Sequence, residues 1–106
     1  MRIYVAGPYR LGDVKANGRR AMDAGTALLA RSHAPLVPHL NHFCHRQTPH
    51  PERTWIDFDL VWLEVADAVL RLPGASEGAD EECDYAGLLG IPVFCTLDAI
   101  PVRAAP

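Results

Sequence analysis

Short apolar runs alternate with longer mixed segments along the chain. The runs occupy residues 3–6, 35–38, 68–72 and 91–94, and most are rich in β-branched residues and bounded by Gly, Pro or Asp. Such runs are typical of strands that are buried on both faces of a parallel sheet. The segments between them are long enough for helices, so the pattern predicts βαβ units with right-handed crossovers.

Three helices are predicted, over residues 14–31, 51–65 and 77–89. Asp13 and Ser76 are favourable N-caps for the first and the third, and Pro51 is favourable in the first turn of the second. Gly90 is expected to end the third helix.

Two of these helices have an apolar stripe that predicts the side facing the core. In the first helix the stripe consists of Val14, Ala21, Met22, Leu28 and Leu29. In the second helix it consists of Trp55, Phe58, Trp62 and Val65.

This pattern predicts a single α/β domain over residues 1–106, a three-layer flavodoxin-like (Rossmann-like) parallel sheet of about four strands in the order 2-1-3-4. The length suffices for one core, and residues 97–106 are expected to be a loose tail. Ligands of such sheets bind beyond the carboxyl ends of the strands, where the strand order reverses. The loops expected there are residues 7–13, 39–50 and 73–76.

Composition narrows the class of partner. The net charge of -3 makes the chain a poor candidate for binding nucleic acid polymers or membrane surfaces. No apolar stretch approaches the ~20 residues of a membrane span, and the first residues lack the apolar core of a signal peptide. The three cysteines include no C-x-x-C pair, which favours neither a disulfide framework nor a zinc site. A reducing cytoplasm is the expected location.

The loop "AGPYRLGD" follows the first strand and opens the first helix. Gly7 would let a ligand approach the backbone, and a helix N-terminus favours anions. Arg10 would add a forked contact to a phosphate. The alternative is an ordinary turn between strand and helix with one solvated arginine.

The segment "SEGADEECD" carries five carboxylates in nine residues. Ser76 can cap the helix and contact a ligand, and Gly78 removes side-chain bulk at the mouth of the site. Glu82 lies about one and a half turns into the helix, where it can face the loops. The alternative is a solvated acidic helix start, which the helix dipole favours by itself.

Asp59 stands inside the aromatic and aliphatic stretch "WIDFDLVWLEVAD". A carboxylate beside an apolar face has a desolvation cost, so it needs a partner or a chemical role. The alternative is a position at the edge of that face with the carboxylate in water.

Four histidines occur in the stretch from residue 39 to residue 50, which is expected to be a loop. It has no H-E-x-x-H pattern and no carboxylate nearby in sequence, so neither a metal nor another cofactor is expected. His39, directly after the second strand, is the best placed to contact a substrate or donate a proton.

Three blocks over roughly residues 2–96 together resemble the nucleoside 2-deoxyribosyltransferase superfamily. They are "IYVAGPYR", "DLVWLEVADAVL" and "SEGADEE", the last similar to the family pattern S-x-G-x-x-x-E. The likeness is greatest to the branch typified by the 2-deoxynucleoside 5-phosphate N-hydrolase and to small bacterial and phage relatives of unassigned function.

The resemblance implies three catalytic residues. Glu82 would attack the anomeric carbon of the sugar and form a glycosyl ester. Asp59 would be the second carboxylate of glycosidic cleavage and assist the leaving base. Tyr4, in the first strand, would orient Glu82.

The resemblance also implies a binding set of Gly7, Arg10, Ser76, Gly78 and His39. Arg10 and Ser76 would hold a 5-phosphate. Ser76 is informative because transferases of free nucleosides tend to carry Asp at this position, which would repel a phosphate.

The chain also departs from the family pattern. Pro8 stands where the phosphate-binding branch tends to have a hydroxyl residue, and the stretch "PHLNHF" follows the small unassigned relatives better than the hydrolase. The C-terminal segment that reaches a neighbouring subunit's site in relatives is short here, with Thr96 and Asp98 as the candidates for that role.

The expected function is therefore hydrolysis of the base–sugar bond of a nucleoside 5-monophosphate, most simply a deoxynucleotide. One alternative is a transferase that exchanges bases, and another is a catalytically silent nucleotide-binding module. The expected partners are a small-molecule nucleotide or nucleoside and further copies of the chain, in a homodimer or a larger homo-oligomer.

Overall fold

The computed structural model describes residues 1–102. Its elements are β1 (Arg2–Ala6), α1 (Val14–Ala30), β2 (Ala34–Leu36), η1 (Pro38–Asn41), α2 (His42–Gln47), α3 (Glu52–Leu63), β3 (Ala68–Arg71), α4 (Glu77–Leu88), β4 (Val93–Phe94) and η2 (Leu97–Ala99), where η1 and η2 are short 3₁₀ helices. The strands form one parallel sheet in the order β2-β1-β3-β4. The predicted fold class and strand order are confirmed.

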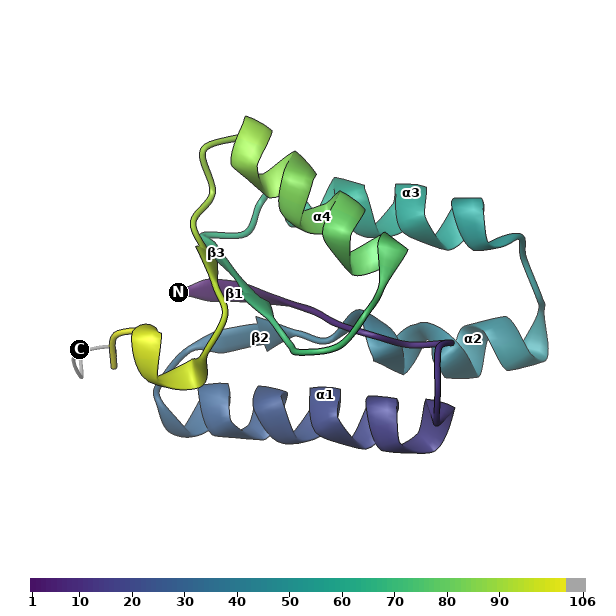
Figure 1. Cartoon of the computed structure of the whole chain (residues 1–106), viewed down its shortest axis with the longest axis horizontal. Helices are drawn as coiled ribbons and strands as arrows, with labels where there is room; N and C mark the ends of the chain where they lie inside the picture. The colour runs from purple at the N-terminus through teal and green to yellow at the C-terminus, as the bar shows by residue number, and fades with distance from the viewer. Residues whose placement is uncertain (103–106) are drawn as a thin grey trace.

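The sheet lies between two helical layers (Figure 1), with α1 on one face and α3 and α4 on the other. One core cluster lies between α1 and the sheet and includes Ile3, Val5 and Leu28. The second lies under α3 and α4 and includes Tyr4 and Leu63. Among residues 1–102, no helix is both long enough and apolar enough to cross a membrane.

Only the two central strands are buried on both faces. All of β3 except Arg71 and all of β1 except Arg2 are buried, whereas β2 and β4 are partly exposed. The expectation of four fully buried strands is wrong for β2 and β4 because each lies at an edge of the sheet, with a neighbour on one side alone.

The predicted helix signals are confirmed at the N-termini of two helices. The Asp13 carboxylate accepts from the amides of Lys15 and Ala16, and the Ser76 hydroxyl accepts from the amide of Ala79. Pro51 is the residue just before α3 rather than part of its first turn.

The buried side of α1 differs from the predicted stripe. It consists of Asn17, Ala21, Gly25 and Leu28, while Val14, Met22 and Leu29 are exposed. Asn17 Nδ2 donates to the carbonyls of Tyr9 and Leu11 at 3.0 and 2.7 Å. Gly25 allows close packing, because a Cβ there would lie 2.9 Å from Cγ2 of Val37. A stripe chosen by hydrophobicity alone misses both residues.

The predicted core side of α3 is also wrong. Phe58, Trp62 and Val65 are exposed, whereas Leu63 is fully buried and Leu60 packs against the same cluster. This helix is apolar on more than one side, so helical spacing does not decide which side meets α4 and the sheet.

Two segments expected to be irregular are ordered, one between β2 and α3 and the other after β4. A loop is expected over residues 39–50, but residues 38–47 form η1 and α2, which are too short to leave a periodic signal.

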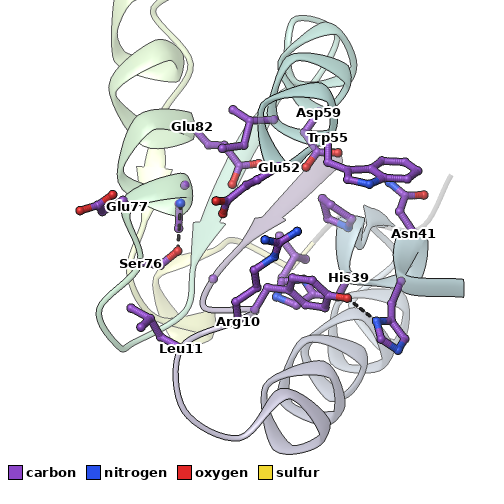
Figure 2. Close-up of a pocket in the computed structure, with 18 of the residues that line it drawn as sticks. Arg10, Leu11, His39, Asn41, Glu52, Trp55, Asp59, Ser76, Glu77 and Glu82 are labelled. Atoms are coloured by element: carbon purple, nitrogen blue, oxygen red, sulfur yellow. Dashed lines mark hydrogen bonds between the residues drawn. The ribbon is translucent and has the colours of Figure 1, made fainter. Parts of the chain in front are cut away.

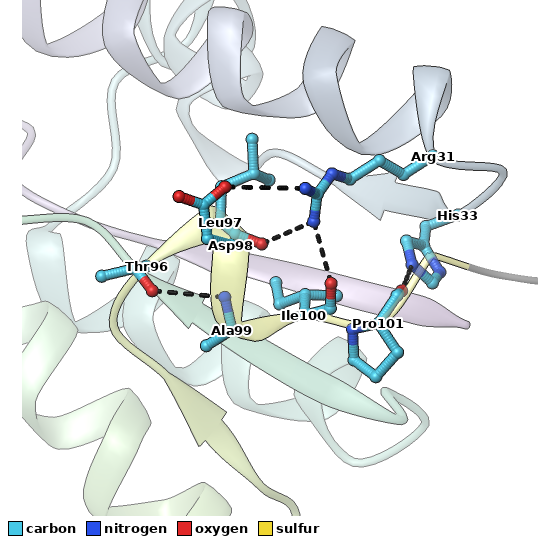
Figure 3. Close-up of polar contacts among 8 residues, drawn as sticks. All are labelled: Arg31, His33, Thr96, Leu97, Asp98, Ala99, Ile100 and Pro101. Atoms are coloured by element: carbon cyan, nitrogen blue, oxygen red, sulfur yellow. Dashed lines mark hydrogen bonds and ion pairs between the residues drawn. The ribbon is translucent and has the colours of Figure 1, made fainter.

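The chain beyond β4 folds back on the α1 side of the sheet (Figure 3). Arg31 donates to the carbonyls of Leu97 and Ile100 at 2.7 and 2.8 Å, and the Ile100 side chain is 1% exposed. The prediction of a loose tail from residue 97 onward is therefore wrong for residues 97–101. The carbonyl of Pro101 lies 2.7 Å from Nε2 of His33. The part of that tail at residues 103–106 lies outside the described residues.

Candidate active site

A cavity of about 430 Å³ opens at the carboxyl ends of the strands. Its walls come from the loop after β1, from η1 and α2, from one side of α3 and from the first turns of α4 (Figure 2). Seven of the eight residues predicted for the site line it, namely Gly7, Arg10, His39, Asp59, Ser76, Gly78 and Glu82. The eighth, Tyr4, is buried and contacts Glu82.

Glu82 differs from the other acids of its helix. Its side chain is 8% exposed, and the Tyr4 hydroxyl donates a hydrogen bond to its Oε2. By contrast, Glu81 pairs with Arg53 and Asp80 pairs with Arg71 on the outside of the helix. The alternative of a solvated acidic face thus describes Glu81 and Asp80 but not Glu82.

Burial raises the pKa of Glu82 to about 8, because the charged carboxylate loses solvation. The Tyr4 hydroxyl acts in the opposite direction, since a donated hydrogen bond stabilises the ionised form. Tyr4 itself is 1% exposed, so it offers this hydrogen bond from a fixed position in β1.

Asp59 lies on α3 and lines the same cavity. Burial raises the pKa of Asp59 to about 7. Within residues 1–102 its carboxylate has no ion-pair partner at 4.0 Å or less, which leaves desolvation unopposed. The carboxyl group can thus carry a proton near neutral pH. Its position in the cavity wall excludes the alternative of a freely solvated edge residue.

Two glycines, in the loops after β1 and β3, are explained by packing between those loops. A Cβ at Gly7 would lie 2.9 Å from Cβ of Leu72, and a Cβ at Gly74 would lie 2.8 Å from Cγ of Pro8. Gly74 also has a φ of +113°, which disfavours side chains. Pro8, the departure from the phosphate-binding pattern, is thus in contact with the loop that leads to Ser76.

Gly78 stands in a more open place. A Cβ there would meet Cδ1 of Ile56 at 3.8 Å, which is an ordinary contact. Packing within the chain therefore does not require glycine at this position, and its predicted role toward a ligand stays a prediction.

His39 lines the cavity, but its ring is engaged with the backbone. Nε2 is 2.9 Å from the carbonyl of Pro8 and must donate to it, whereas Nδ1 is buried and has no hydrogen-bond partner among residues 1–102. Burial lowers the pKa of His39, which favours the neutral ring. This arrangement anchors the loop after β1 and leaves the donor nitrogen occupied, which argues against proton donation by His39. Contact with a substrate stays a prediction.

The cavity also contains aromatic residues that sequence reasoning did not assign to it. Tyr9, His42, His45 and Trp55 line it together with Asn41 and Glu52. His42 and His45 lie on α2, a short helix that the sequence pattern does not predict. Trp55 belongs to the apolar stripe that the sequence pattern assigns to the core. Histidines three residues apart would have been the available signal. Within residues 1–102, no three His, Cys, Asp or Glu side chains are grouped to hold a metal ion.

Comparisons with known proteins agree with the fold. Residues 1–96 match the sequence model of a family described as "Domain of unknown function (DUF7768)". No protein with a curated description matches the chain. Among solved structures, a 2-deoxyribosyltransferase from the psychrotolerant bacterium Bacillus psychrosaccharolyticus is similar, with 24% identity and a TM-score of 0.67. The match covers 88% of this chain and 69% of that one, and at this identity it shows a shared fold.

Proposed function

We propose that this chain, which belongs to the family described as Domain of unknown function (DUF7768), hydrolyses the base–sugar bond of a nucleoside 5-monophosphate, most simply a deoxynucleotide. The observation that carries the proposal is the buried pair of Tyr4 and Glu82 at the wall of a cavity that also holds Asp59. Pure binding of an anionic ligand would not require two desolvated carboxylates in its site.

The proposed reaction has two steps. In the first, Glu82 attacks the anomeric carbon, the bond to the base nitrogen breaks, and the sugar is left as an ester of the enzyme. Asp59 gives its proton to the departing base. In the second step, water adds to the anomeric carbon, the ester bond to Glu82 breaks, and the water gives a proton to Asp59. Tyr4 orients the Glu82 carboxylate in both steps.

The phosphate is proposed to lie between Arg10 and the start of α4. The first amides of a helix have no helical partner and point toward such a ligand. Ser76 caps this helix, and Arg10 lines the same cavity (Figure 2). Glu52 and Glu77 also line the cavity, so a phosphate is bound favourably only where Arg10 and the α4 amides outweigh their charge.

A transferase that passes the sugar to a second base is the alternative that the solved 2-deoxyribosyltransferase favours. The two reactions share the ester and differ in whether water or a base releases it. A silent nucleotide-binding module is the remaining alternative.

Incubation with a panel of nucleotides and nucleosides, followed by chromatography for free base, separates these functions. Release from monophosphates alone supports the proposal. Exchange that requires an added base supports the transferase, and saturable binding without turnover supports the silent module. Glu82→Gln should abolish base release, whereas Glu81→Gln, a change at the neighbouring acid outside the cavity, should not.

Phosphate recognition is tested separately. Arg10→Ala should weaken binding of monophosphates and leave binding of the matching nucleosides nearly unchanged. Arg19→Ala, an exposed charge on α1 outside the cavity, is the matched control. Equal loss for nucleosides and monophosphates would contradict the phosphate assignment.

We also propose a homodimer or a larger homo-oligomer. Phe58, Val61 and Trp62 on α3 and Val65 just after it are exposed at steps of three and four, so they form an apolar group on one side of the molecule. Contiguous exposed apolar residues mark interaction sites. Sedimentation of the wild type and of Trp62→Glu tests this proposal, and a monomeric wild type would refute it.

A further inference from the structure

One side of the cavity is built mainly from aromatic rings. We call Tyr9, His42, His45 and Trp55 the aromatic wall. Ring centroids are 5.7 Å apart between Tyr9 and His42 and 6.1 Å apart between His45 and Trp55, both in edge-to-face arrangement. Figure 2 shows Trp55 on the side of the cavity away from Ser76 and the start of α4.

Trp55 is held in a fixed orientation by its surroundings. Its indole Nε1 donates to Nδ1 of His45 at 2.8 Å. His50 and Phe58 contact the indole edge-on, with centroids 5.7 and 5.8 Å away. Neither of these two rings lines the cavity, so they support Trp55 from outside it. Such support lowers the entropy lost when a ligand binds against the indole.

The hydrogen bonds also determine the tautomer of His45. Its Nδ1 accepts from Nε1 of Trp55 and from the backbone amide of His50 at 3.3 Å. In the neutral ring the proton must therefore be on Nε2, which makes His45 a donor beside Trp55. A ligand ring with a carbonyl or an unprotonated ring nitrogen has the complementary acceptor.

Trp55 and Asp59 are four residues apart on α3 and line the same cavity, so they lie on one side of the helix. A flat ring placed on Trp55 therefore lies next to the carboxyl group that is proposed to protonate the leaving base. The α4 amides that suit a phosphate lie at Ser76, on the side of the cavity away from Trp55, and Arg10 lies between these two sides. The two ends of the cavity thus match the two ends of a nucleotide.

We infer that the aromatic wall is the subsite of the leaving base, with Trp55 as its stacking surface and His45 as a hydrogen-bond donor to it. This inference rests on the proposed function, and it restricts the substrates to those with a planar, aromatic base. Stacking of a base on an aromatic side chain corresponds to roughly 5- to 150-fold in affinity.

The two tryptophans of the chain allow a direct test. In Trp62→Phe the indole of Trp55 is the sole tryptophan emitter, and in Trp55→Phe that of Trp62 is. We expect saturable quenching of the Trp62→Phe protein by guanosine and uridine 5-monophosphates, and none by ribose 5-phosphate. The Trp55→Phe protein should show no saturable quenching. The titrations are made with Glu82→Gln also present, so that turnover does not consume the ligand.

A second measurement tests the need for an aromatic base. 5,6-Dihydrouridine 5-monophosphate keeps the sugar and phosphate but has a saturated, puckered base, so it should bind roughly 5-fold or more weakly than the uridine nucleotide. Trp55→Ala should remove that difference, while Trp62→Ala should keep it. Circular dichroism of each variant confirms that it is folded.

The outcomes separate the inference from the function on which it rests. Base release by the wild type, together with unquenched Trp55 or equal affinity for the saturated analogue, would overturn the base subsite and leave the proposed function standing. Quenching of Trp55 by nucleotides in a protein that never releases base would overturn the function and support the subsite as a binding site.

Discussion

Replacing Glu82 by Gln should abolish base release and also make the protein more stable at alkaline pH. Burial raises the pKa of Glu82 from 4.5 to about 8 in the folded protein. Between these two values the folded state holds a proton that the unfolded state has lost, so the stability of the wild type falls as pH rises through this window. Gln has similar shape, remains neutral, and can still accept the hydrogen bond from Tyr4.

The size of the effect follows from the same pKa difference. From 4.5 to about 8 is about 3.5 units, and at about 1.4 kcal/mol per unit the cost of ionising Glu82 in place is roughly 5 kcal/mol. The Tyr4 hydroxyl offsets part of this cost, because a hydrogen bond to a charged group contributes about 1.5–3 kcal/mol. We therefore expect Glu82→Gln to be about 2–3 kcal/mol more stable than the wild type above about pH 8.5, and within about 1 kcal/mol of it near pH 4.5.

Urea unfolding followed by circular dichroism across this pH range measures both proteins. Glu81→Gln is the control, because Arg53 holds the pKa of Glu81 below its usual range and the sign is opposite. The ion pair of Glu81 with Arg53 stabilises the folded protein above the pKa that Glu81 has in the unfolded chain, and this stabilisation disappears at acidic pH. Glu81→Gln should therefore cause a small loss of stability at neutral and alkaline pH. A Glu82→Gln protein no more stable than the wild type at alkaline pH would refute the argument that burial penalises this carboxylate.

Three further predictions concern the site and its scaffold. The rate of base release should peak in a narrow range between about pH 7 and about pH 8, because Asp59 must be protonated while Glu82 is ionised. Burial raises the pKa of Asp59 to about 7 and the pKa of Glu82 to about 8. A rate that does not vary between about pH 5 and about pH 10 would contradict these roles. Gly25→Ala should lower the free energy of unfolding by about 1–3 kcal/mol, since its Cβ would lie 2.9 Å from Val37. Gly18→Ala should raise it by about 0.5–1 kcal/mol, because a Cβ there would meet no other part of residues 1–102 within 4 Å beyond its own stretch of helix. Thermal unfolding of both variants checks the pair, and equal effects would show that packing against Val37 does not explain Gly25. Arg31→Met should lower the free energy of unfolding by about 1.5–3 kcal/mol, because it removes the hydrogen bonds to the Leu97 and Ile100 carbonyls. Faster amide hydrogen exchange near Ile100 is the expected result, and unchanged exchange would contradict the prediction.

The sequence was sufficient to predict the fold because its signals are local and repeated. Runs of β-branched residues, the Asp13 and Ser76 caps and Gly90 with its φ of +74° each act within a few residues. The strand order was predicted from the alternation of strands and helices and the common flavodoxin-like arrangement, and the structure confirms it.

The helix sides could not be predicted in the same way. On α3 the apolar residues surround much of the helix, and the side that meets the core is decided by α4 and the sheet. On α1 the deciding residues are Asn17 and Gly25, which a hydrophobic stripe ignores. The part of the cavity wall that α2 forms could not be predicted, because a helix of six residues is too short to show a helical period in the sequence.

For the proposed site, the sequence by itself determined which residue types stand at the carboxyl ends of the strands: Glu82 and Ser76 after β3, Gly7 and Arg10 after β1. Only the tertiary structure decided that Glu82 is buried against Tyr4 while Glu81 beside it is solvated, and that Trp55 faces the cavity while Trp62 faces solvent. The physical reason is that desolvation depends on what packs around a side chain, and those neighbours come from segments far apart in the chain.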